Sequence, residues 1–164
     1  MKNIVLIGMP GVGKSTIGVI LAKVKGFHFV DADIVIQEQE GKLLKDIIEE
    51  KGVDGFIQVE NRVNASLDVE KSVIATGGSV IYGKEAMEHL KEIGTVIYLK
   101  LDYEPLTKRL GNLKGRGVVL REGQDLKALY EERTVLYEKY ADMIIDEENK
   151  TIEETLQTII DKLD

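Results

Sequence analysis

The sequence contains no cysteine and only two prolines in 164 residues. Without cysteine the chain forms neither a disulfide bond nor a thiolate metal site, which suits a reducing compartment. No apolar run approaches the roughly 18 residues that a helix needs to cross a bilayer, and the N-terminus leads into a strand-like run instead of a basic and then apolar signal segment. Because low-complexity runs are also missing, we expect an ordered cytoplasmic protein that has no membrane partner.

The charge balance is acidic, with 22 Lys and Arg against 29 Asp and Glu and a net charge of −7. Such a surface repels a nucleic-acid backbone, so we expect no nucleic-acid partner. A small anionic ligand needs only local positive potential, which a helix N-terminus and a few arginines supply. The hydrophobic content of 43% and the charged content of 31% are those of a soluble globular protein. We expect a single domain over residues 1–164, acting as a monomer.

Apolar periodicity predicts short strands that alternate with helices. This alternation indicates a three-layer α/β/α fold around a five-stranded parallel sheet, and ligands of such folds bind outside the carboxyl ends of the strands. Thr151 and Glu154 match a capping box at the start of the last helix. The predicted strands are 2–8, 27–30, 72–75, 95–101 and 143–146, and the predicted helices are 14–25, 33–39, 43–50, 55–69, 84–92, 104–110, 124–140 and 152–163.

The segment 8–15 carries the strongest motif. Gly8, Gly13, Lys14 and Ser15 match G-x-x-x-x-G-K-[ST] between a predicted strand and a predicted helix. Glycines let backbone N–H groups turn inward around phosphate oxygens, Lys14 should reach the β- and γ-phosphates, and the Ser15 hydroxyl should coordinate Mg²⁺. The flanking strand and helix argue against the alternative of a plain glycine turn. The residues of this segment expected to bind ATP are Gly11, Val12, Gly13, Lys14, Ser15 and Thr16.

Two further clusters follow predicted strands. Asp31 and Asp33 end the second strand and Gly77 and Gly78 end the third, so all four should meet the phosphate loop at one edge of the sheet. The carboxylates can bind Mg²⁺ through water, polarise an acceptor hydroxyl or cap a helix. The glycines can let the backbone approach a substrate or simply form a tight turn. The acidic run 146–148 reads as a solvated turn, although the segment after the fifth strand could also touch adenine.

Taken together, these segments resemble shikimate kinase, and the resemblance covers nearly the whole chain. The combination of the phosphate loop with the Asp-x-Asp and Gly-Gly phrases is much more specific than the loop alone. The resemblance implies a P-loop fold of the nucleoside-monophosphate-kinase type, with a mobile lid at about 111–123 and an acceptor-binding helical region at about 33–61. The matching phrases are 8–16, 29–33, 75–78 and 96–99, together with Gly41, Phe56, Glu60, Arg133 and Tyr137.

The resemblance also implies residue roles. ATP would phosphorylate the 3-hydroxyl of shikimate, a step of aromatic amino acid biosynthesis, with Mg²⁺ held by Ser15 and, through water, by Asp31. Arg116 is similar to a lid arginine that covers the γ-phosphate, with an ordinary solvated surface arginine as the alternative, and Arg109 is similar to an arginine packed on adenine. The implied catalytic residues are Lys14, Asp33 and Arg116, and the implied acceptor contacts are Asp33, Gly77, Gly78, Ser79 and Arg133.

Three positions depart from the family pattern. Ile57 stands where the family carries an arginine that pairs with the shikimate carboxylate, and losing such a contact costs on the order of 2–3 kcal/mol of binding, unless another arginine such as Arg62 compensates. Ser79 interrupts a run of three glycines, where it can reshape the wall or donate a hydrogen bond. Gly117 replaces a proline of the lid. All three lie on the acceptor side or in the lid, so the acceptor can differ from shikimate.

Two other functions therefore stay open. A kinase on this scaffold can act on a sugar acid, a hydroxy acid or a nucleoside monophosphate. Nucleotide acceptors usually need several arginines, and basic residues are sparse between 33 and 70. The second alternative is a regulator that binds ATP without transferring phosphate, against which intact Lys14, Asp33 and Arg116 argue.

Overall fold

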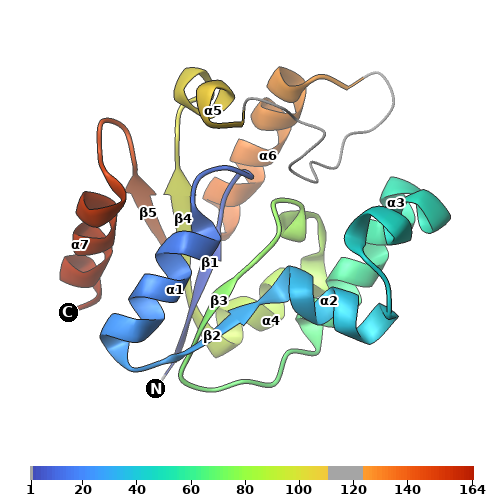
Figure 1. Ribbon diagram of the computed structural model, residues 1–164, viewed down its shortest axis with the longest axis horizontal. Coiled ribbons are helices and arrows are strands. Elements are labelled where there is room, and N and C mark those ends of the chain that lie inside the picture. The colour runs from blue at the N-terminus through green and yellow to red at the C-terminus, as the bar shows by residue number, and fades with distance from the viewer. Residues whose placement is uncertain (1, 111–123) are drawn as a thin grey trace.

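The computed structural model describes residues 2–110 and 124–164. Its strands form one parallel sheet in the order β2-β3-β1-β4-β5, and helices cover both faces of this sheet, as predicted (Figure 1). The strands are β1 (Asn3–Ile7), β2 (His28–Asp31), β3 (Ser72–Ala75), β4 (Gly94–Lys100) and β5 (Met143–Asp146). The helices are α1 (Lys14–Lys25), α2 (Ala32–Glu40), α3 (Leu44–Ala65), α4 (Lys84–Ile93), α5 (Tyr103–Leu110), α6 (Leu126–Tyr140) and α7 (Ile152–Leu163), with a 3₁₀ turn, η1 (Val80–Tyr82).

Strand β1 lies at the centre of the sheet, between β3 and β4. All five of its residues are buried, since helices cover both faces of the sheet. This is why the strand reads as a nearly continuous apolar run in the sequence. Asn3 is its polar exception: Nδ2 donates to the carbonyls of Val69 (2.9 Å) and Ile93 (3.2 Å), and Oδ1 accepts from the Ser72 N–H at 2.9 Å. These bonds tie together the amino ends of three strands and leave their carboxyl ends to carry the loops of the site.

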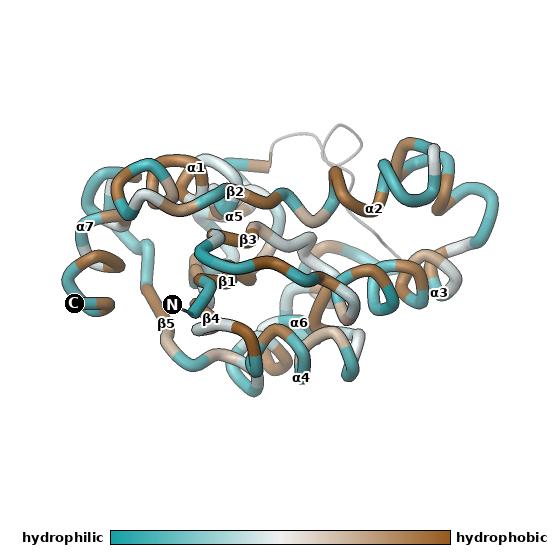
Figure 2. The backbone as a smooth tube through the Cα atoms, turned by 90° about the horizontal axis from the view of Figure 1, so that it is seen from below, coloured by the Kyte–Doolittle hydropathy of each residue, from teal (hydrophilic) through white to brown (hydrophobic). Residues whose placement is uncertain are grey.

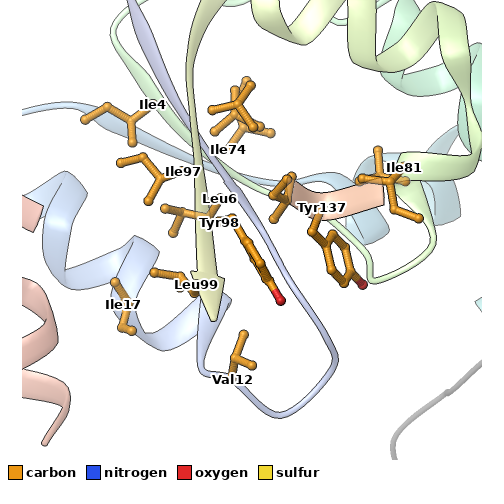
Figure 3. Packing of buried hydrophobic residues seen from close by; sticks show 14 of the residues in the cluster. Ile4, Leu6, Val12, Ile17, Ile74, Ile81, Ile97, Tyr98, Leu99 and Tyr137 are labelled. Carbon is orange, nitrogen blue, oxygen red and sulfur yellow. The ribbon is translucent and has the colours of Figure 1, made fainter. Parts of the chain in front are cut away.

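The apolar core fills the space between the sheet and its helices. Figure 2 shows α1 and α7 on one face of the sheet and α4 and α6 on the other. Leu6 and Ile97 are fully buried between these layers (Figure 3). Tyr98 of β4 stacks on Tyr137 of α6 with ring centroids 5.0 Å apart, which fixes α6 against the sheet. A second apolar cluster joins α2 to α3 and comprises Ile36, Ile47, Phe56, Val59 and Val63.

Helix α3 differs most from the sequence prediction. The sequence predicts separate helices at 43–50 and 55–69, whereas the structure has one element, Leu44–Ala65, that bends at Gly52. Gly52 has a φ of 74° and a ψ of 176°, a conformation that side-chain-bearing residues rarely adopt. The chain therefore changes direction at Gly52, and a helical segment continues on each side of it. The turn η1 was also absent from the prediction, because one 3₁₀ turn has too few residues to show a period.

Outside α3 and η1, the predicted bounds of the strands and helices agree with the structure to within two residues. The capping box is present, since Thr151 Oγ1 accepts from the Glu154 N–H and Glu154 Oε1 accepts from the Thr151 N–H, both at 3.1 Å. The predicted lid at 111–123, with Arg116 and Gly117, lies outside the described residues. Over the ranges 2–110 and 124–164, every helix is too short or too polar to cross a bilayer.

Candidate active site

The loop between β1 and α1 has the shape of an anion-binding turn. Gly8, Gly11 and Gly13 have φ values of 149°, 91° and 93°, which glycine adopts without strain. At Gly8 a Cβ atom would also lie 2.8 Å from the Leu99 carbonyl oxygen of β4. Helix α1 begins at Lys14, directly after the loop, so its unpaired N–H groups and positive end are directed at a ligand held there.

Lys14 is held inside this loop. It is 8% exposed, and its Nζ donates to the carbonyl oxygens of Gly8 at 2.6 Å and Met9 at 3.0 Å. Burial lowers the pKa of this ammonium to about 8, and the negative charge of Asp33 partly opposes that effect. Because a bound anion would stabilise the charged ammonium, the loop favours a negatively charged ligand.

An open cleft of about 650 Å³ lies in front of the loop. It joins the phosphate loop to Asp33, to the glycine pair and to Arg109, which come from separate segments of the chain. Ile152 at the start of α7 also lines the cleft, although it belongs to no motif. Val12 is 1% exposed and packs beneath the loop (Figure 3). The predicted site residues that line the cleft are Gly11, Gly13, Lys14, Ser15, Thr16, Asp33, Gly77, Gly78 and Arg109.

The two aspartates occupy different environments. Asp31 caps α2, because its Oδ1 accepts from the Asp33 N–H at 3.0 Å. Asp33 lies in the first turn of α2 and borders the cleft. Burial raises the pKa of Asp33 to about 6, with a further contribution from the charge of Asp31, while Lys14 opposes the rise. A carboxylate with this proton affinity suits a group that orients a hydroxyl and accepts its proton near neutral pH.

Close packing explains the glycine pair after β3. A Cβ atom at Gly77 would lie 2.8 Å from both Asp33 Oδ1 and Glu60 Oε2, and one at Gly78 would lie 2.8 Å from Arg133 Nη1. Larger residues would therefore displace the polar side chains that surround this backbone. These two positions therefore require space and not an unusual φ, and close approach of a substrate to this backbone stays a prediction.

Beyond the glycine pair, a small cavity of about 30 Å³ extends toward α3 and α6, and we call it the acceptor cavity. Arg133 of α6 enters it while only 1% exposed, and its Cζ lies 5.6 Å from the centroid of the Tyr82 ring. Ser79 Oγ donates to Glu60 Oε1 at 2.6 Å, so Ser79 does donate a hydrogen bond. The residues lining this cavity are Pro10, Asp33, Leu44, Phe56, Glu60, Gly77, Gly78, Ser79 and Arg133.

The suggestion that Arg62 compensates for Ile57 is wrong. Arg62 Nη2 donates to Glu40 Oε2 at 3.2 Å, and the Arg62 side chain is 59% exposed on the outer side of α3. Arg62 lines an outer surface together with Gln58, which lies four residues earlier on the same face of the helix. Ile57 itself is partly exposed. Among the described residues, Arg133 is accordingly the one guanidinium that lines the cavity.

The turn after β5 is buried at one position, which corrects the expectation of a solvated turn. Glu147 is 2% exposed, and its Oε1 lies 3.5 Å from Arg109 Nη1. The Glu147 N–H donates to the Lys100 carbonyl at 2.9 Å, which continues the pairing of β5 with β4 and fixes the backbone at this position. Burial raises the pKa of Glu147 to about 7, against the opposing charge of Arg109. Arg109 Nη1 also reaches the Val12 carbonyl at 3.5 Å.

The oxygen groups near the phosphate loop fit Mg²⁺. Ser15 lines the cleft. Asp31 is not among the residues that line it and uses one carboxylate oxygen to cap α2, so its contact with a metal-bound water stays a prediction. Over the described part of the chain, His, Cys, Asp and Glu form no group of three or more that could hold a metal alone. This sparse set of hard oxygen ligands is typical of Mg²⁺ that keeps its waters and binds substrate phosphates.

Comparison with known proteins agrees with this geometry. The shikimate kinase family model matches residues 10–164. The shikimate kinase of Persephonella marina is 37% identical over 164 residues, which cover 99% of each chain. Among solved structures, the shikimate kinase of Acinetobacter baumannii in complex with shikimate has a TM-score of 0.88 and 32% identity, over 99% of this chain and 93% of that one.

The shikimate kinase of Aquifex aeolicus has a TM-score of 0.84 and 33% identity, over 98% of this chain and 95% of that one. These matches extend from the phosphate loop to the last helix, so they include the acceptor side, where this chain departs from the expected pattern at Ile57 and Ser79. The sequence matches and the structural matches both cover nearly all of this chain. The chain belongs to the shikimate kinase family.

Proposed function

We propose that this protein transfers the γ-phosphoryl group of ATP to the 3-hydroxyl of shikimate, a step of aromatic amino acid biosynthesis. The observation that carries the proposal is the continuous lining of one cleft, from the phosphate loop through Asp33 to the glycine pair, with Arg133 buried in the cavity beyond. The Acinetobacter baumannii relative, whose structure contains shikimate, supports this choice of acceptor.

The donor half of the site holds the triphosphate. The N–H groups of the loop and of the first turn of α1 surround phosphate oxygens, and Lys14 exchanges its bonds to the Gly8 and Met9 carbonyls for phosphate oxygens. Ser15 and, through water, Asp31 would hold Mg²⁺, which would supply positive charge to neutralise the phosphates. Arg109 packs against the base.

The acceptor half aligns the hydroxyl with the γ-phosphorus. Arg133 pairs with the acceptor carboxylate, and the backbone of Gly77 and Gly78 lets the ring approach between Arg133 and Asp33. Asp33 accepts a hydrogen bond from the reacting hydroxyl. As the new oxygen–phosphorus bond forms, the bond from the γ-phosphorus to the bridging oxygen of ADP breaks, and the hydroxyl proton passes to Asp33. Arg116, by resemblance, neutralises charge on the moving phosphoryl group.

One observation favours a second candidate, a kinase of the same scaffold for another small hydroxy acid. In the described residues the acceptor cavity has the single guanidinium of Arg133, because Ile57 supplies none and Arg62 faces outward. An acceptor with more hydroxyls, such as a sugar acid, would depend less on a second arginine. We infer that the reaction takes place in the cytoplasm, on a monomer with no nucleic-acid or membrane partner. The acidic net charge of −7 supports the part of this inference that concerns nucleic acid.

An acceptor panel tests the proposal. Purified protein with Mg-ATP is assayed for ADP release with shikimate, sugar acids, hydroxy amino acids and nucleoside monophosphates. We expect saturable turnover with shikimate, and a loss of about 100-fold or more in kcat for Lys14→Ala, since one preorganised charged donor contributes that much to transfer. Turnover with a sugar acid alone would favour the second candidate. ATP binding without turnover on any acceptor would instead indicate a regulator.

A further inference from the structure

Glu60 is a buried carboxylate whose two oxygens differ. The residue is 1% exposed and lines the acceptor cavity from α3. Its Oε1 accepts the hydrogen bond from Ser79 Oγ at 2.6 Å. Its Oε2 is buried without a hydrogen-bond partner, beside the Gly77 backbone and on the same side as Asp33 Oδ1. A buried charged oxygen without a donor is costly, so this oxygen is placed to carry a proton.

The charges that face Glu60 come from three elements packed around it. Asp33 of α2 is negative, and Lys14 of α1 and Arg133 of α6 are positive. Tyr137 of α6 also faces it, but burial raises the pKa of Tyr137 so far that it stays neutral. Burial raises the pKa of Glu60 to about 7, even though Ser79 and the two cations favour the charged form.

Under the function proposed above, Lys14 and Arg133 each also bind a ligand. Lys14 leaves the loop carbonyls for the phosphates of ATP, and Arg133 pairs with the carboxylate of the acceptor. Once the acceptor is bound, Arg133 neutralises the new anion instead of Glu60, while Asp33 stays close by. The charged form of Glu60 loses a stabilising partner and gains a second negative neighbour in the same small cavity.

We propose that Glu60 takes up a proton from solvent when the anionic acceptor binds, so that Arg133 is left to the acceptor carboxylate. The inference rests on the proposed function, because it assumes an acceptor that carries a carboxylate. The neutral Glu60 keeps its bond from Ser79 and presents an O–H group in place of an unpaired oxygen anion. Acceptor binding is thereby coupled to pH at this end of the site.

The coupling has a definite sign. Glu60 binds a proton more tightly in the complex than in the free protein, so binding weakens as pH rises above about 7, by at most tenfold per pH unit. Glu60→Gln imitates the protonated state. As pH rises above about 7, the dissociation constant for shikimate should increase about fivefold or more in the wild type but less than about twofold in Glu60→Gln. Ser79→Ala removes a bond that favours the charged form, so its loss of affinity should begin at higher pH.

Isothermal titration of the full chain with shikimate, in buffers of different ionisation heat near pH 7.5, measures this proton uptake directly. We expect a positive fractional uptake in the wild type, the same uptake in Glu85→Gln, an exposed glutamate bonded to Asn61 on the facing helix, and loss of the uptake in Glu60→Gln. Shikimate binding without proton uptake in the wild type would overturn the inference, as would undiminished uptake in Glu60→Gln.

Two further measurements cover a variant that fails to fold and a wild type that does not accept shikimate. If Glu60→Gln does not fold, the midpoint of the pH dependence in Ser79→Ala decides, and an unchanged midpoint contradicts the role of Glu60. If the wild type binds ATP but neither binds nor phosphorylates shikimate, the choice of acceptor is wrong. The same titration with an accepted hydroxy acid then tests the coupling separately.

Discussion

Burial sets the protonation of the ionisable side chains around the cleft. The pKa of Lys14 falls to about 8, while the pKa of Asp33 rises to about 6 and those of Glu60 and Glu147 rise to about 7. In each case the largest cause is the loss of water around the charged form. Nearby opposite charges reduce these shifts without cancelling them. The result is a set of groups that change charge close to the pH at which the reaction runs.

At the residue scale, Ile57→Arg tests how the acceptor is held. A second guanidinium beside Arg133 would pair with the acceptor carboxylate, so we expect the KM for shikimate to fall about tenfold while the KM for ATP stays unchanged. Steady-state kinetics with each substrate varied in turn measures both. Gln58→Arg is the matched control, because that exposed position shares the outer surface of α3 with Arg62. Equal effects at the two positions, or no gain at Ile57, would refute this placement.

Sequence reasoning reached some of these residues and missed others for a physical reason. Lys14 and Asp33 lie in short segments whose spacing reflects a local backbone shape. Glu60 and Glu147 acquire their properties from neighbours distant in the chain, such as Ser79 and Arg109. A glutamate inside a helix or an acidic turn gives no local sign of burial. The resemblance already singled out Glu60, without a role, but the burial of both carboxylates is seen only in the structure.

At the element scale, strand ends position the site. The phosphate loop follows β1, Asp31 ends β2, and the glycine pair follows β3, so the parallel sheet brings them to one edge (Figure 1). This much could be predicted, because strand and helix periods are properties of nearby residues. The bend of α3 could not, since Gly52 alone does not tell whether a helix stops or turns. Within the helical segment that follows the bend, Glu60 and Arg62 are two residues apart, about 200° around the helix axis, so Glu60 faces the cavity while Arg62 faces solvent.

A second prediction, at this scale, concerns Glu147, in the turn between β5 and α7, and its ion pair with Arg109. Glu147 holds the Arg109 guanidinium beside the loop, so Glu147→Gln should loosen it and raise the KM for ATP about three- to tenfold, the loss expected of one charge-assisted contact. The KM for shikimate should stay the same. Glu148→Gln, next in the chain and exposed, should leave both values unchanged. A rise in the KM for shikimate alone would contradict a role on the nucleotide side.

At the scale of the whole molecule, the same shifts govern stability. Between about pH 4.5 and pH 7 the folded chain binds more protons than the unfolded chain, because the pKa values of Asp33, Glu60 and Glu147 are raised. Stability therefore falls as pH rises through that window. The net charge of −7 at neutral pH adds repulsion in the same direction. Lys14 acts at higher pH, where its lowered pKa lets stability recover between about pH 8 and pH 10.5.

Chemical denaturation at several pH values checks this balance. We expect the free energy of unfolding to be higher at about pH 5.5 than at about pH 7.5, by on the order of 1–3 kcal/mol. A variant that combines Glu60→Gln with Glu147→Gln should show a smaller difference, because two of the raised carboxyls are gone. Stability that is flat or rises over this interval in the wild type would contradict the charge assignment.

Phosphoryl transfer to shikimate itself is tested most directly by identifying the product. Phosphorus NMR of a reaction containing the protein, Mg-ATP and shikimate should show one new phosphomonoester, coupled to the proton on C3 of the ring, that grows in step with ADP and is absent with Lys14→Ala. Release of inorganic phosphate with ADP, and no phosphorylated shikimate, would contradict the proposed reaction.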